Sequence, residues 1–224
     1  MMLGEYQSRT DLAEGLAETV AKELGEALET RGSATLAVPG GTTPGPFLEA
    51  LSKADLDWSR VHVMLTDERF VPESSERSNT ALLRRTLMQN NAAAATLIPF
   101  YQQAETPEEV LDDITLGVAK ALPLDVCVLG MGADMHTASL FPGADMLEAA
   151  LSDAAPPVLP MRADGAPEPR LTLTAPILKA ARHIHILITG AEKKSALDVA
   201  QHEGSVAAAP VRAVLPQATV HYAE

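Results

Sequence analysis

The sequence is poor in cysteine, in aromatic residues and in positive charge. Cys127 is the single cysteine among 224 residues, so no internal disulfide can form, which favours a reducing compartment. Its place inside the apolar run 126–129 indicates a small buried side chain rather than a nucleophile. Because only 4% of the residues are aromatic, the core must be built from Leu, Val, Ile, Ala and Met.

The shortage of basic residues leaves a formal net charge of −13. Binding to a nucleic-acid backbone depends on a basic face, so we expect no nucleic-acid partner. If the ligand is a small anion, the few cations near its site must create a local positive field inside an acidic protein. The Arg and Lys residues that coincide with turns are therefore the ones to examine.

Long hydrophobic runs are also missing. No uninterrupted apolar stretch approaches the roughly 18–20 residues that cross a bilayer, and the first residues lack the basic region and apolar run of a secretory signal. We therefore expect a cytoplasmic protein that does not associate with membranes. Residues 1–224 show no internal repeat and are expected to form one domain, in which the Pro-rich and Gly-containing segment 154–169 is an excursion or a hairpin.

Helical and strand-like patterns alternate along the chain. Leucines and one valine spaced four apart predict a helix over residues 8–31. Further helices are expected over 46–51, 79–88, 106–121, 175–181 and 190–199, with a last helical turn over 210–215. Strands are expected over 35–38, 61–66, 125–129, 170–174 (half-exposed), 183–189 and 218–222 (an edge strand). This alternation predicts an α/β fold, with a mainly parallel sheet and helices on both faces.

The most informative stretch is residues 130–143, Gly-Met-Gly-Ala-Asp-Met-His-Thr-Ala-Ser-Leu-Phe-Pro-Gly. It follows the predicted strand 125–129 and places Asp134 and His136 two residues apart, before a short helix-compatible segment. The carboxyl end of a buried strand is where an open α/β sheet keeps its chemistry, and histidine can act as a base near neutral pH. The alternative is a glycine turn with a surface histidine.

Two other predicted strands also end in polar residues. Gly40-Gly41-Thr42-Thr43 follows the first strand, and Asp67-Glu68-Arg69 follows the second. In a parallel sheet these ends meet residues 130–136 at one edge. A glycine-rich turn that leads into a helix exposes N–H groups that suit a phosphate, although a simple tight turn is the alternative. The G-x-G-x-x-G fingerprint and the P-loop are absent, so no dinucleotide fold is predicted.

Charged residues near these turns have two interpretations each. Asp67 and Glu68 lack further ligands at a metal-site spacing, so no metal is expected. Arg69 either pairs with its acidic neighbours or donates to a phosphate or carbonyl oxygen. Two lysines open the helix after strand 183–189, which is unfavourable to the helix dipole and suggests an anionic ligand, unless they are simply solvated. The other histidines are taken as structural or solvent-facing: His62, His183, His185, His202 and His221.

Taken together, these motifs resemble the 6-phosphogluconolactonase family. The resemblance is carried by residues 36–44, 66–72 with Ser78 and Asn79, 130–143 and 190–193, and it runs from about residue 8 to the C-terminus. The run His-Thr-Ala-Ser-Leu-Phe-Pro-Gly is the specific part, since the related glucosamine-6-phosphate deaminases usually continue with Asn-Glu-Pro. Met135 stands where the family commonly has glycine, and a side chain there restricts the backbone.

The resemblance implies a modified Rossmann-like fold, shared with the deaminases and with ribose-5-phosphate isomerase. It also implies hydrolysis of 6-phospho-D-glucono-1,5-lactone to 6-phosphogluconate, the second step of the oxidative pentose phosphate pathway. No organic cofactor and no catalytic metal are implied, and no obligatory protein partner is inferred.

For this chemistry His136 is expected to take a proton from the water that attacks the lactone carbonyl, and Asp134 to support the imidazole. The oxyanion is expected to meet either N–H groups of residues 130–132 or Arg69. The phosphate is expected at Gly41, Thr42 and Lys193 rather than Lys194. The remaining residues assigned to the substrate site are Gly40, Asp67, Asn79, Gly130 and Gly132.

Two other functions are compatible with parts of the pattern. An isomerase or deaminase of amino-sugar phosphates would use the same Asp and His on an opened ring, but the Ser-Leu-Phe-Pro continuation argues against it. A non-catalytic sugar-phosphate sensor would carry a DNA-binding module, for which this chain has neither spare length nor a basic face.

Overall fold

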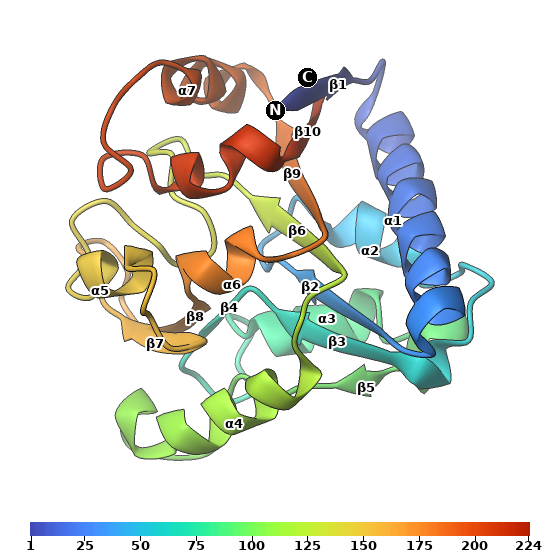
Figure 1. Cartoon of the computed structure of the whole chain (residues 1–224), viewed down its shortest axis with the longest axis horizontal. Helices are drawn as coiled ribbons and strands as arrows, with labels where there is room; N and C mark the ends of the chain where they lie inside the picture. The colour runs from blue at the N-terminus through green and yellow to red at the C-terminus, as the bar shows by residue number, and fades with distance from the viewer.

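The computed structural model describes all residues from 1 to 224 and is built on one seven-stranded sheet (Figure 1). Every neighbouring pair of strands in this sheet is parallel. In spatial order the strands are β1 (Met2–Glu5), β10 (Thr219–Ala223), β9 (His183–Thr189), β6 (Val126–Gly130), β2 (Ala34–Val38), β3 (Val61–Leu65) and β5 (Thr96–Leu97). The predicted α/β class with a mainly parallel sheet is therefore confirmed.

Helices cover both faces of the sheet because successive strand residues point to opposite sides. In β2, for example, Leu36 belongs to the core on one face and Ala37 to the core on the other. The first face is covered by α1 (Arg9–Arg31), α2 (Gly45–Leu51) and α3 (Asn79–Thr86). The second core includes α4 (Leu111–Ala121), α5 (Leu147–Leu151), α6 (Ala175–Lys179) and α7 (Ala191–Gln201). None of the helices is both long and apolar enough to span a membrane.

A second, antiparallel sheet of three strands lies beside the first, in the order β4 (Asp67–Arg69), β8 (Arg170–Leu173), β7 (Val158–Met161). Residues 162–169 join β7 to β8. The prediction that strand 170–174 is half-exposed was wrong, since Leu171, Thr172 and Leu173 are all fully buried. This strand is sandwiched between two others and packs on the core, a surrounding that its alternating sequence did not reveal.

Three further predictions need correction. The strand expected at the sheet edge is β10, but β1 pairs outside it and forms that edge of the sheet, while β5 forms the other. The four residues of β1 are too few for a detectable alternation. The helix-compatible segment after His136 forms turns, because Ala138 and Gly143 adopt positive φ angles of 49° and 77°. The helix expected over 106–121 begins as a 3-10 turn, Pro107–Val110, and becomes α-helical only at α4.

A chain of polar side chains ties α1 to the sheet. Tyr6 Oη lies 2.8 Å from His221 Nδ1, and His221 Nε2 lies 3.0 Å from His185 Nδ1. His185 Nε2 in turn lies 2.8 Å from Glu23 Oε2 on α1. Burial, together with the neighbouring His185, lowers the pKa of His221 to about 4. These two histidines are therefore structural, as the sequence suggested.

Candidate active site

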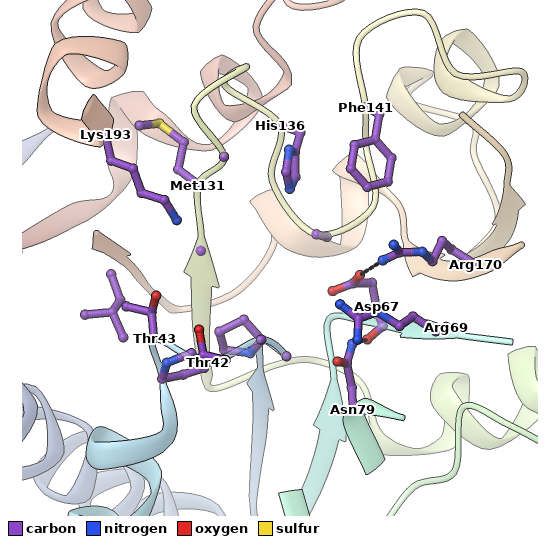
Figure 2. A pocket seen from close by; sticks show the side chains of 18 residues that line it. Thr42, Thr43, Asp67, Arg69, Asn79, Met131, His136, Phe141, Arg170 and Lys193 are labelled. Atoms are coloured by element: carbon purple, nitrogen blue, oxygen red, sulfur yellow. Dashed lines mark hydrogen bonds and ion pairs between the residues drawn. The ribbon is translucent and has the colours of Figure 1, made fainter. Parts of the chain in front are cut away.

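The three polar strand ends meet in one cleft of about 290 Å³ (Figure 2). Strands β6, β2 and β3 are neighbours in the sheet, so the turns at their carboxyl ends lie side by side. Most of the predicted site residues line this cleft: Gly40, Gly41, Thr42, Asp67, Arg69, Asn79, Gly130, Gly132, His136 and Lys193. Asp134 does not line it but contacts His136 from outside.

Asp134 and His136 form a hydrogen-bonded pair at the end of β6. Asp134 Oδ1 lies 2.5 Å from His136 Nδ1 and also accepts the backbone N–H of His136 at 3.2 Å. A proton on Nδ1, donated to the carboxylate, leaves Nε2 as the nitrogen that can accept another. The imidazole is 30% exposed and the carboxylate 53% exposed. The pair thus has the arrangement of a general base supported by an acid.

Glycine at position 132 allows this pair to form. A Cβ on Gly132 would lie 2.3 Å from both Cε1 and Nδ1 of His136, and 2.4 Å from Asp134 Oδ1. The Gly132 N–H donates to the carbonyl oxygen of His136 at 3.0 Å. The backbone N–H of Gly132, one of the oxyanion donors expected from residues 130–132, is therefore already used in this hydrogen bond and is not available to an oxyanion.

Met135 occupies a left-handed backbone position, with φ of 65°. Its N–H donates to the Gly132 carbonyl oxygen at 3.0 Å, and its own carbonyl oxygen accepts the Val211 N–H at 3.1 Å. Such a φ is what favours glycine. Position 135 thus has a backbone conformation that glycine adopts more easily, and Met135 keeps the turn with two backbone hydrogen bonds.

Glu68 serves the fold rather than the cleft. Its side chain is completely buried, and its carboxylate accepts backbone N–H groups of Arg69, Asn79 and Thr80 and the hydroxyls of Ser78 and Thr80. Burial raises the pKa of Glu68, while the hydrogen bonds from Asn79, Thr80 and Arg69 oppose the rise. The carboxylate therefore holds the amino end of α3 against β4. No group of three or more His, Cys, Asp or Glu side chains is arranged to hold a metal ion.

Asp67 and Asn79 line the cleft, but both are nearly buried and bonded within the protein. Asp67 Oδ2 accepts the Ser139 hydroxyl at 2.5 Å and lies 3.9 Å from Arg170 Nη1. The Asn79 side-chain amide donates to the Asp67 carbonyl oxygen at 3.0 Å. A Cβ on Gly40 would lie 2.0 Å from Asn79 Cγ, so glycine is required for this packing. Their assignment to substrate binding stays a prediction.

Arg69 and Arg170 face each other across the β4–β8 pair. Like charges directly opposite in a sheet are destabilising, and the Nε atoms of both side chains are buried without a hydrogen-bond partner. Burial lowers the pKa of Arg170, and the charge of Arg69 adds to this effect while that of Asp67 opposes it. An anionic oxygen between the two guanidinium groups would relieve both problems. Sequence reasoning missed Arg170, whose only signal is its partner across the sheet.

Lys193 stands at the other side of the cleft, near Thr42 and Thr43 (Figure 2). Burial lowers its pKa, against the opposing charges of Glu192 and Asp134. It forms no ion pair, whereas its neighbour Lys194 lies 3.0 Å from Glu5 and over the Tyr222 ring. The cleft therefore has a cation at each side, with the His136 ring between them, in a protein of net charge −13.

Comparison with known proteins gives the family. Residues 7–222 match the family described as Glucosamine-6-phosphate isomerases/6-phosphogluconolactonase. The chain belongs to this family. A 6-phosphogluconolactonase of Rhizobium meliloti is 46% identical over 216 residues, which cover 95% of this chain and 93% of that protein. One of Pseudomonas aeruginosa is 44% identical over 220 residues, covering 97% and 92%.

The solved structures show the same relationship. The crystal structure of a 6-phosphogluconolactonase from Shewanella baltica superposes with a TM-score of 0.97 at 34% identity, covering 100% of this chain and 98% of the other. The resemblance seen in the sequence motifs is thereby confirmed for this family member, as is the fold that it implied.

Proposed function

We propose that this family member hydrolyses 6-phospho-D-glucono-1,5-lactone to 6-phosphogluconate, as a step of the oxidative pentose phosphate pathway. One observation carries the proposal. The His136–Asp134 pair opens onto a cleft that has Lys193 on one side and the Arg69–Arg170 pair on the other. A substrate with a phosphate at one end and an oxyanion forming at the other matches this distribution of charge. The names of the relatives at 46% and 44% identity support it.

In the proposed reaction, His136 Nε2 takes a proton from a water molecule as the water oxygen bonds to the lactone carbonyl carbon. Asp134 stabilises the imidazolium that forms and holds the ring by its Nδ1–H. The tetrahedral oxyanion then collapses, the bond between that carbon and the ring oxygen breaks, and His136 returns the proton to the leaving oxygen. The new acid finally loses a proton to water and becomes the carboxylate product.

The two sides of the cleft are given different tasks. Lys193, with the turn of Gly41 and Thr42, is proposed to bind the phosphate, because the lysine is unpaired and half-buried. Arg69, helped by Arg170, is proposed to stabilise the oxyanion, since both have an unpartnered buried Nε. A cleft of about 290 Å³ is of the size that holds a small ligand.

A lactonase assay tests this function. The lactone is generated in situ by an upstream dehydrogenase, and its decay is compared with and without the protein. We expect kcat, obtained from the rate of decay per molecule of protein, to exceed the spontaneous first-order rate constant by at least about 100-fold, since general base catalysis alone contributes about 10²–10⁴-fold. Ammonia release from glucosamine 6-phosphate is measured in parallel. Decay at the spontaneous rate would exclude the proposal, and ammonia release in its place would assign the protein to the other branch of the family.

A further inference from the structure

Phe141 packs against the His136 ring. The two ring centroids are 4.5 Å apart and their planes are tilted by 45° (Figure 2). Both rings line the cleft, and the Arg170 guanidinium lies 5.6 Å from the centroid of the Phe141 ring. The aromatic side chain therefore stands between a cation and the imidazole that the proposed reaction uses as its base.

The segment that carries Phe141 is held by buried contacts. The Thr137 hydroxyl donates to the Gly130 carbonyl oxygen at 2.9 Å, and Leu140 is fully buried with its N–H bonded to the Thr137 carbonyl oxygen at 3.0 Å. The Ser139 hydroxyl, also buried, donates to Asp67 at 2.5 Å. These anchors bring the chain back on itself, so that Phe141 meets a ring only five positions earlier.

His136 needs such a contact because its other support is weak. Its side chain is bound through Nδ1 alone, to a carboxylate that is itself 53% exposed. A single hydrogen bond leaves the ring free to rotate about its bonds to the backbone, and rotation changes where Nε2 points. Gly132 lies beside Cε1 and Nδ1, where an added Cβ would come within 2.3 Å, but glycine has no side chain that could hold the ring. An aromatic side chain against the ring limits the remaining freedom.

We propose that Phe141 is a positioning residue that fixes the plane of the His136 imidazole, so that Nε2 faces the bound lactone. The proposal rests on the proposed function, because it requires His136 to be the base. It also assigns a role in the reaction to the Ser-Leu-Phe-Pro segment, because Phe141 belongs to that segment. Loss of the ring should reduce kcat by about 10- to 100-fold, since misplacement by about 1 Å costs of that order. The KM should change by less than about 3-fold.

The test is a double-mutant cycle with Phe141→Leu and His136→Gln, read as kcat and KM. Phe141→Leu should lower kcat in the wild-type background and change it less than about 2-fold when His136 is already Gln. Phe141→Tyr, which keeps the ring, should retain kcat within about 3-fold. Phe100→Leu removes a buried ring from the core at a position that does not line the cleft, and it is the control for a general packing effect. Equal losses in both backgrounds, or a loss as large for Phe100→Leu, would overturn the proposal.

A second measurement does not depend on activity. The Phe141 ring current should displace the proton resonance of His136 Cε1–H, which is assigned by its disappearance in His136→Gln. The resonance should move in Phe141→Leu and stay near its position in Phe141→Tyr. A resonance that does not move in Phe141→Leu would refute the positioning role even if the protein is a lactonase. If the resonance moves in Phe141→Leu but the wild-type protein has no lactonase activity, the proposed function is wrong while the contact between the two rings stands.

Discussion

Substitution of Gly132 by alanine should lower the rate of catalysis in a protein that still folds. The added Cβ would lie 2.3 Å from two atoms of the His136 ring and 2.4 Å from Asp134 Oδ1. Ordinary contact begins at 3.4 Å, so the ring must retreat by about 1 Å or the turn must open. The hydrogen bond from Nδ1 to Asp134, now 2.5 Å, cannot keep its length through such a shift.

A displacement of about 1 Å at a catalytic group costs about 100-fold in rate, or about 2.7 kcal/mol of transition-state stabilisation. We therefore expect Gly132→Ala to lower kcat for the lactone by about 100-fold. The KM should change much less, because the atoms nearest the new methyl group belong to His136 and Asp134 rather than to the lysine and arginine side chains on the two sides of the cleft.

The assay compares initial rates of lactone decay, corrected for spontaneous hydrolysis, at equal concentrations of folded protein. Gly117→Ala is the matched control, since it makes the same chemical change in α4 with the nearest atom 4.0 Å away. This control should keep the wild-type kcat. A folded Gly132→Ala protein with kcat within about 3-fold of wild type would refute the reasoning, because the reaction would then not depend on the position of the His136–Asp134 pair.

Three further predictions concern the phosphate, the buried histidines and the turn. Lys193→Ala should raise KM by at least about 10-fold with little change in kcat. Because burial lowers the pKa of Lys193, the wild-type KM should rise at a lower alkaline pH than the KM of Lys193→Arg. Identical pH profiles of KM for the two proteins would contradict this prediction. In the folded protein His221 has a pKa of about 4, below its ordinary value of 6.5, so between these pH values the unfolded chain binds more protons than the folded one. The free energy of unfolding should therefore fall by about 3 kcal/mol as the pH drops from about 6.5 to about 4. In urea unfolding, His221→Gln should lose most of this pH dependence, and an unchanged slope would refute the assignment. Met135→Gly should keep activity within about 2-fold. Met135→Val puts a β-branched side chain at φ of 65° and should lower both the melting temperature and kcat. Equal melting temperatures and kcat values for the two variants would show that the left-handed turn imposes no constraint.

The sequence predicted the main sheet because buried strands of Val, Leu and Ile alternate with amphipathic helices, and these signals are local. The meeting of Gly41, Asp67 and His136 at one edge followed from the parallel arrangement alone. The edge strand β1 was not predicted, because its four residues carry no periodic signal.

The parts of the site that sequence reasoning missed depend on pairing between distant segments. Arg170 joins the site because β8 pairs with β4, some hundred positions earlier, and no local pattern announces that register. Phe141 was noted as part of a motif, but its contact with His136 depends on the positive φ of Ala138 and on the buried Ser139–Asp67 hydrogen bond. Neither can be read from residue type.

The most direct test of the account is the kcat of His136→Gln, measured beside His202→Gln, which changes an exposed histidine outside the cleft. We predict a loss of at least about 100-fold in kcat for His136→Gln, within the range that a general base contributes. Binding of 6-phosphogluconate, measured by calorimetry, should stay within about 3-fold of wild type, and His202→Gln should keep full activity. A folded His136→Gln protein with near-normal kcat would contradict the central claim that His136 activates the water.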